Sequence, residues 1–137
     1  MAVRLDHTIV AARDRDRSAR FLSDILGLPE PARLGPFTIV TIGATSLDFM
    51  EADGAIHTQH YAFLVTEQEF DDIFARIRAR DLTYWADPHR NEAGRINTWD
   101  GGRGVYWSDP DGHMLEIITR PYGSGGTATD NPHPLVR

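Results

Sequence analysis

The chain has 137 residues, a length that fits one compact domain or two small modules sharing a core. It contains no cysteine, so disulfide bonds and thiolate metal sites are excluded, and any transition metal must be held by histidine and carboxylate side chains. The formal net charge is −6, and basic residues are interspersed with acidic ones, so we expect no nucleic-acid partner. No apolar run approaches the ~20 residues of a membrane helix, and the N-terminus lacks the pattern of a secretory signal. We therefore expect a cytoplasmic protein without a membrane partner.

The first part of the sequence predicts a strand, a helix and two further strands. Residues 3–11 are rich in β-branched and apolar residues, which is typical of a strand. Apolar residues at helical spacing then predict a helix that ends at Gly27. After a stretch broken by proline and glycine, residues 37–43 and 45–51 predict two strands joined by a tight turn.

The same order then starts again. Residues 60–66 predict a strand, and an apolar stripe from Glu67 to Arg80 predicts a helix. Further strands are expected from about residue 81 and around Ile96–Trp99. Residues 103–109 and 113–120 predict a hairpin, because the Pro110-Asp111-Gly112 sequence between them is a strong turn signal.

This repetition predicts two modules. Aligning His7 with His60 also aligns Phe21 with Phe74, and small loop adjustments bring Leu47-Asp48-Phe49 onto Leu115-Glu116-Ile117. The expected boundaries are 1–54 for the first module and 55–122 for the second. Residues 123–137 are rich in Gly, Ser, Thr, Pro and Asn without periodicity, and we expect a flexible tail there.

Each module carries a histidine on its first strand and a carboxylate on its last. Glu116 lies between apolar neighbours, where a carboxylate is costly unless it is paired, hydrogen-bonded or bound to a metal. A single such histidine is often a core residue, and a single strand glutamate often pairs with arginine. The same positions recur in both modules, however, and this favours a shared metal site made by His7, His60 and Glu116. Two imidazoles and one carboxylate suit a divalent Fe, Mn, Ni, Co or Zn ion with open positions for a substrate.

Three segments resemble the vicinal oxygen chelate superfamily, which includes glyoxalase I, extradiol dioxygenases, fosfomycin-resistance enzymes and bleomycin-binding proteins. They are LDHTIV with the following SARFLSDILGLP, then HYAFLV, and then the closing hairpin GRGVYWSDPDGHMLEIITRPYG. The resemblance implies an α+β fold of two paired βαβββ modules, forming a cupped mixed sheet around a central metal. It assigns His7, His60 and Glu116 to the usual three ligand positions and implies a homodimer.

The resemblance also suggests catalytic residues. The fourth position of the family falls on Asp48, which would be a fourth ligand or a nearby base, although it is one methylene shorter than the glutamate of glyoxalase I. The dioxygenases of the family also have a second His and Tyr near the metal. The candidates here, none of which is fixed by spacing, are Tyr61, Tyr106, Tyr122 and His113, and of these we select Tyr106. We expect His113, beside the hairpin turn, at the surface, and we assign no role to His57, His89 or His133.

The sequence leaves two functions open, beside a third and weaker option, a structural relic in which the would-be ligands only form hydrogen bonds with each other. The first is a metal-dependent enzyme of the glyoxalase or dioxygenase type, acting on a small molecule that binds the metal through two adjacent oxygens. The second is a metal-free protein that sequesters an antibiotic, as bleomycin-resistance proteins do. We expect most of the aromatic residues on the strands to be core residues, with the alternative that some of Trp85, Trp99 and Tyr106 line a pocket for a flat or apolar ligand. Arg95 and Arg103 could meet an anionic substrate, but we expect them to be solvated charges.

Overall fold

A computed structural model describes residues 2–136, which divide into two compact units. The first unit extends to Thr58 and includes residues 109–112, the turn of the closing hairpin. The second unit comprises residues 59–108 and those from His113 onward. Among the described residues, no helix has the length and apolarity needed to cross a membrane.

The first unit is a mixed four-stranded sheet with one helix. Its elements are β1 (His7–Ala12), α1 (Arg15–Leu26), β2 (Ala32–Leu34), β3 (Phe37–Ile42) and β4 (Thr45–Glu51). The strand order is β1-β4-β3-β2, in which β1 runs parallel to β4 and the other neighbours are antiparallel.

The second unit repeats this plan. Its main elements are β5 (His60–Leu64), α2 (Glu67–Ala79), β6 (Tyr84–Trp85), β7 (Gly104–Ser108) and β8 (Met114–Ile118). Two short 3₁₀ helices, η1 (Trp99–Gly101) and η2 (Pro134–Val136), are added to it. The strand order β5-β8-β7-β6, with β5 parallel to β8, matches that of the first unit. The predicted α+β fold of βαβββ modules is thereby confirmed.

Both helices have the ends that their sequences specify. Asp14 accepts a hydrogen bond from the backbone N–H of Arg17 at 3.0 Å, and α1 ends at Gly27, whose φ of 70° is left-handed and suits glycine. Thr66 and Glu69 form a reciprocal capping box at the start of α2. These caps satisfy backbone groups that the first and last helical turns leave free.

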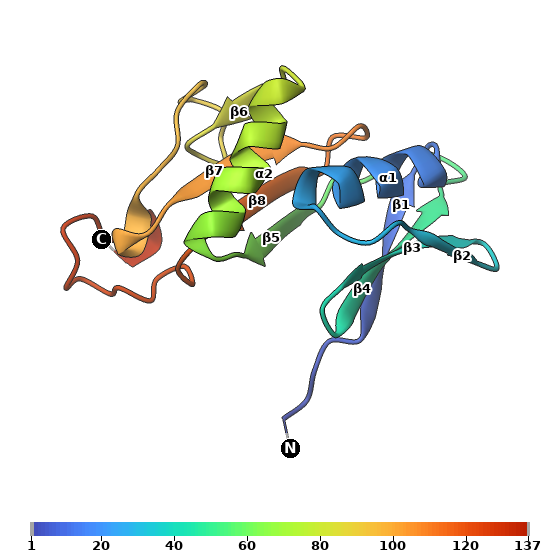
Figure 1. The fold of residues 1–137 in the computed structure, drawn as a ribbon, viewed down its shortest axis with the longest axis horizontal. Coiled ribbons are helices and arrows are strands. Elements are labelled where there is room, and N and C mark those ends of the chain that lie inside the picture. Colours follow the sequence, from blue (N-terminus) through green and yellow to red (C-terminus); the bar gives the residue numbers. More distant parts are fainter. Residues whose placement is uncertain (1, 137) are drawn as a thin grey trace. The chain divides into compact units, whose positions relative to one another are not determined.

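Helix α2 lies over one face of the second sheet (Figure 1). Side chains alternate between the faces of a strand, so Val105, Trp107, Leu115 and Ile117 are buried on the helix side. They form a core with Phe70, Ile73 and Ile77 of α2. The alternate residues of β5, β7 and β8, which include His60, Tyr106 and Glu116, therefore face away from the helix.

Three local expectations need correction. Strand β2 is absent from the prediction because it has only three residues, all exposed, and so carries no apolar pattern. The strand expected around Ile96–Trp99 is wrong: Asn97 forms a single bridge to Gly104, and the chain then turns into η1. The surface position expected for His113 is also wrong, because this side chain is 1% exposed and its Nδ1 accepts a hydrogen bond from the backbone N–H of Gln59 at 3.0 Å.

Candidate metal centre and substrate pocket

The site of the second unit is built on a row of three residues in neighbouring strands. Ala62 of β5 lies beside Glu116 of β8, and Glu116 lies beside Tyr106 of β7. His60 is two residues before Ala62 and therefore shares its face of the sheet. The small side chain of Ala62 leaves space next to the Glu116 carboxylate.

His60 and Glu116, predicted from positions far apart in the sequence, are brought together. The Nε2 atom of His60 lies 3.0 Å from Oε1 of Glu116, and Glu116 is 5% exposed. The Nδ1 atom of His60 lies 3.1 Å from the backbone oxygen of Met114. Because a carbonyl oxygen only accepts hydrogen bonds, Nδ1 carries a proton and donates it, which turns Nε2 towards the carboxylate.

This arrangement needs a cation between Nε2 and the carboxylate. Without a metal, the cation is a proton: the hydrogen bond to Glu116 raises the pKa of His60, burial opposes that rise, and the negative charge of Glu116 and the bond to Met114 add to it. With a metal, Nε2 and Oε1 would both be ligands. Metal bonds of about 2.1 Å at right angles separate neighbouring ligand atoms by about 3.0 Å, which is the spacing observed. The donor set therefore fits a divalent metal, with Met114 orienting the imidazole as such sites require.

Tyr106 closes the other side of the carboxylate. Burial raises the pKa of its hydroxyl far above the ordinary value, and the charge of Glu116 and a hydrogen bond to that carboxylate raise it further. The hydroxyl therefore stays protonated near neutral pH and acts as a hydrogen-bond donor. The Tyr106 ring also stacks on His60, with ring centres 5.9 Å apart, and contacts the edge of Trp99 at 6.3 Å.

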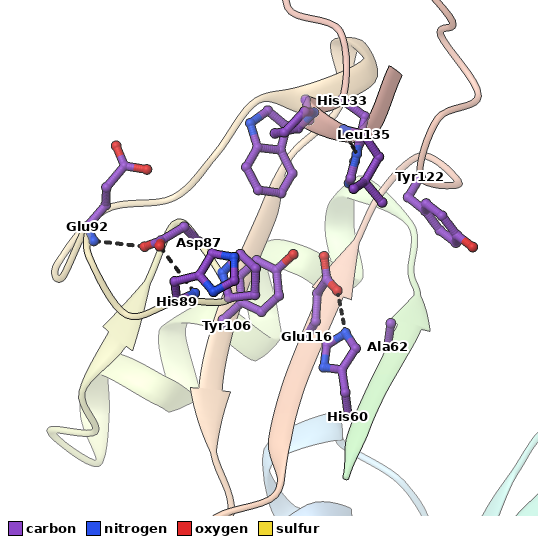
Figure 2. Close-up of a pocket in the computed structure, with 13 residues that line it drawn as sticks. His60, Ala62, Asp87, His89, Glu92, Tyr106, Glu116, Tyr122, His133 and Leu135 are labelled. Atoms are coloured by element: carbon purple, nitrogen blue, oxygen red, sulfur yellow. Dashed lines mark hydrogen bonds and ion pairs between the residues drawn. The ribbon is translucent and has the colours of Figure 1, made fainter. Parts of the chain in front are cut away.

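A cavity of about 610 Å³ opens over this row of residues (Figure 2). Its volume is in the range of small-molecule sites. Its walls are aromatic and apolar on several sides, and the described residues that line it include no arginine. They are His60, Ala62, Asp87, Pro88, His89, Glu92, Trp99, Tyr106, Glu116, Tyr122, His133, Pro134 and Leu135.

One wall of the cavity is a loop that Asp87 organises. The carboxylate of Asp87 accepts hydrogen bonds from the backbone N–H groups of His89, Asn91 and Glu92 at 2.8–3.2 Å. Although burial works to raise the pKa of Asp87, these backbone donors outweigh it and lower the pKa below the ordinary range. The loop is thus held by an ionised carboxylate.

His7 and Asp48 lie in the first unit. Nδ1 of His7 is bonded to Asp6 at 2.7 Å, which leaves Nε2 available for a metal. The hydrogen bond to Asp6 and the negative charge of Asp48 raise the pKa of His7. Asp48 is 7% exposed, and its Oδ1 accepts a hydrogen bond from the hydroxyl of Ser46 at 2.8 Å. Within residues 2–136 no group of three or more His, Asp or Glu side chains is arranged to hold a metal, so the triad with His7 stays a prediction.

Comparison with known proteins identifies the family. Residues 4–117 match the model of the Glyoxalase/Bleomycin resistance protein/Dioxygenase superfamily. The chain belongs to this superfamily. The resemblance seen in the sequence is thereby confirmed.

Two curated members of the superfamily have related sequences. Glutathione transferase FosA of Serratia marcescens is 31% identical over 120 residues, which cover 82% of this chain and 78% of that protein. Metallothiol transferase FosB of Shouchella clausii is 27% identical over 122 residues, which cover 84% and 79%.

Solved structures of the superfamily include nearer relatives. Oxidase ChaP-H1 is 64% identical, with a TM-score of 0.88, and the match covers 90% of this chain and all of that one. Oxidase ChaP-H2 is 60% identical, with a TM-score of 0.88 and coverage of 92% and 100%. Fosfomycin resistance protein FosX of Mesorhizobium loti shares the fold, with a TM-score of 0.66 and 22% identity, over 88% of this chain and 95% of that one.

The structure adds pocket residues that the sequence did not reveal. For Trp99 and Tyr106 the pocket, which was the less favoured alternative, is the position found, whereas Trp85 is not among the described residues that line the cavity. His89 and His133, to which the sequence assigned no role, also line it. Both lie in segments without periodicity. The one feature that could have pointed to an ordered path is an aspartate earlier in the chain that accepts hydrogen bonds from the backbone of the segment: Asp87 for the segment of His89, and Asp100 for that of His133.

Proposed function

We propose that this chain is a divalent-metal-dependent oxidase or dioxygenase acting on a small, flat substrate with two adjacent oxygen atoms. The observation that carries the proposal is the His60–Glu116 pair, in which Met114 orients Nε2 towards the carboxylate at ligand spacing. Two relatives at 60% identity or more are oxidases, and one curated relative is a metallothiol transferase, which supports both a metal and an oxidation.

His60, Glu116 and His7 would hold the metal, which we propose to be Fe, Mn, Ni, Co or Zn. When bound, such a metal supplies Lewis acidity and, in the case of iron, a site for oxygen. His60 and Glu116 provide ligand atoms on one side and leave the cavity side for the substrate. Met114 and Asp6 fix the imidazole orientations through Nδ1 of His60 and of His7.

Tyr106 and Asp48 would take the catalytic roles. The Tyr106 hydroxyl remains protonated and lies beside Glu116, so it would donate a hydrogen bond to a substrate oxygen on which negative charge develops. Asp48 would accept a proton from the substrate, as the family position that it occupies suggests. Its second oxygen has no protein donor among residues 2–136, whereas its first is held by Ser46.

The cavity walls favour a neutral aromatic substrate over an anionic one. An anionic group such as a phosphonate requires arginine or lysine partners, and the described lining contains neither. Arg103, one of the charges considered from the sequence, is bound to Glu67 and Asp71 at 2.8 Å and lies over the Phe70 ring. Trp99, Tyr106 and Tyr122 offer faces and edges for a flat ring system.

We further propose a cytoplasmic homodimer, as the family resemblance implies. Val3, Leu5 and Ile9 of the first unit expose large apolar side chains that a second copy would cover. Light scattering coupled to size exclusion gives the mass of the particle, and a monomer at micromolar concentration contradicts this part of the proposal.

Metal content tests the main proposal. Protein reconstituted with each of the five metals should retain about one ion per chain, and His60→Ala and Glu116→Gln should lose it. His57→Ala, which changes an exposed histidine away from the pocket, is the matched control and should keep the metal. Oxygen uptake by the iron-loaded protein, with a panel of aromatic diols, then tests oxidation. The proposal fails if none of the five metals is retained by the unmodified protein.

A further inference from the structure

The C-terminal segment, residues 121–136, forms a wall of the substrate pocket. Tyr122, His133, Pro134 and Leu135 from this segment line the same cavity as His60 and Glu116. Figure 2 shows His133 and Leu135 across the cavity from that pair. The match to the superfamily model ends at residue 117, so this wall lies outside the pattern that the family shares. A wall of that kind is suited to selecting a substrate, whereas the shared residues carry out the chemistry.

Asp100 holds the segment in place from η1. This side chain is 3% exposed, and its two oxygens accept hydrogen bonds from the backbone N–H groups of Gly123 at 2.8 Å and Gly125 at 3.2 Å. Its own N–H donates to the backbone oxygen of Asn131 at 2.9 Å. The anchor therefore holds both the start and the end of the loop that leads to His133.

The orientation of His133 is fixed within this wall. Its ring meets the edge of Trp99, with ring centres 4.9 Å apart, and contacts Tyr122 at 5.7 Å. Its Nδ1 accepts a hydrogen bond from the backbone N–H of Leu135 at 3.1 Å. Because Nδ1 accepts, the proton of the neutral ring is on Nε2, which makes Nε2–H a donor.

Within residues 2–136 that donor has no hydrogen-bond partner. Nε2 is also not fully buried. Among these residues, the indole nitrogen of Trp107 is the only side-chain nitrogen or oxygen that is buried without a hydrogen-bond partner. His133 is 8% exposed and lines the cavity, so the cavity offers its Nε2–H a place to meet a ligand.

We propose that His133 determines substrate specificity, by donating a hydrogen bond from Nε2–H to a substrate oxygen remote from the two that bind the metal. The proposal rests on the proposed function for the position of the chelating oxygens. It gives the substrate class a third oxygen, a neutral carbonyl or hydroxyl at the far end of a flat ring system. A substrate that lacks this oxygen leaves the donor without a partner once the cavity is filled, and it binds more weakly for that reason.

Two probes of similar size separate this role from simple packing. Esculetin is a catechol fused to a lactone ring, so its carbonyl is remote from its adjacent hydroxyls. The naphthalenediol with adjacent hydroxyls on its outer edge has the same two-ring size and no carbonyl. Zinc has no redox chemistry, so zinc-loaded protein would bind the diols without oxidising them, and calorimetry measures the affinity of each probe.

Three proteins are compared: the unmodified chain, His133→Phe and His133→Gln. Phenylalanine keeps the ring contact with Trp99 and lacks the donor, whereas glutamine places an amide N–H close to the position of Nε2. His133→Phe should lose about tenfold in esculetin affinity, which is the effect of one hydrogen bond, and should bind the naphthalenediol as before. His133→Gln should recover most of the esculetin affinity.

Other results overturn the proposal. An equal loss for both probes in His133→Phe shows that the residue only packs, and no loss shows that the donor faces no ligand. Failure of the unmodified chain to prefer esculetin overturns it as well. Metal content is measured on the same samples, and the titrations are repeated without metal, so failure of the metal site is seen separately from failure of His133.

Discussion

The anchoring of the C-terminal segment by Asp100 leads to a quantitative prediction. In Asp100→Gly both side-chain hydrogen bonds, to Gly123 and to Gly125, are lost. Hydrogen bonds to a charged group contribute about 1.5–3 kcal/mol each, and the longer bond, at 3.2 Å, belongs at the low end of that range. We therefore assign about 3–4 kcal/mol to the two bonds together.

A second effect partly offsets this loss. Asp100 has a φ of 62°, a left-handed conformation that costs about 1 kcal/mol for residues other than glycine. Glycine removes that cost, so the net loss should be about 2–3 kcal/mol. Opening of residues 121–136 should accordingly become about 30- to 150-fold more frequent.

Hydrogen exchange measured by mass spectrometry tests this directly. Peptides from residues 121–136 should lose protection by that factor in Asp100→Gly, while peptides from α2 keep theirs. Asp100→Asn is the matched control, because asparagine tolerates the left-handed conformation and retains one acceptor oxygen, so its effect should be smaller. Equal loss of protection in α2 would indicate general destabilisation, and unchanged protection in the segment would refute the anchor.

Three further predictions concern the pocket and the fold. Tyr106→Phe should keep its metal but oxidise aromatic diols at least about tenfold more slowly, as oxygen uptake will show; an unchanged rate contradicts the donor role. Asp87→Asn should lower the free energy of unfolding by about 1–3 kcal/mol at neutral pH. Because the folded-state pKa of Asp87 is lowered, this stabilisation exists above the unfolded pKa of about 4 and disappears as the pH falls through the folded pKa. The free energies of unfolding of the two proteins, measured by urea titration, should therefore converge in acid. A difference that stays constant with pH would contradict the role of the Asp87 carboxylate. Thr66→Ala removes the cap of α2 and should cost about 1 kcal/mol, or about 3 °C in Tm, whereas Gln68→Ala, on the exposed face, should change Tm little.

The elements that the sequence predicted are those that local patterns specify. Helix α2 was expected from Glu67 to Arg80 because of its apolar stripe, and it extends from Glu67 to Ala79. The closing hairpin was likewise expected from a local pattern, two apolar strands joined by turn residues. Strand β2 and η1 were missed, since each has three residues and depends on partners elsewhere in the chain.

The site shows the same division. His60 and Glu116 could be paired from the sequence because the repeat places both on one sheet face, and the structure brings them to 3.0 Å. The positions of His89 and His133 could not be derived, since they depend on how Asp87 and Asp100 bind the backbone of non-periodic segments. Such bonds follow from the folded path of the chain and leave no periodic signal in the sequence.

The repeat also shows why its two carboxylates should differ in role. In the first unit His7 lies beside Ser46, and in the second His60 lies beside Met114, so in both the carboxylate comes two residues later on the neighbouring strand. In the second unit, Glu116 is long enough to reach the imidazole of His60. In the first unit, Asp48 is one methylene shorter and its Oδ1 accepts a hydrogen bond from Ser46. His7 bonds to Asp6 instead. Equal register with unequal reach thus supports the proposed ligand role of Glu116. The same comparison favours the proposed role of Asp48 as a proton acceptor over that of a fourth ligand. Its side chain is too short to reach as far as that of Glu116, and the bond from Ser46 to Oδ1 leaves the second oxygen for a proton.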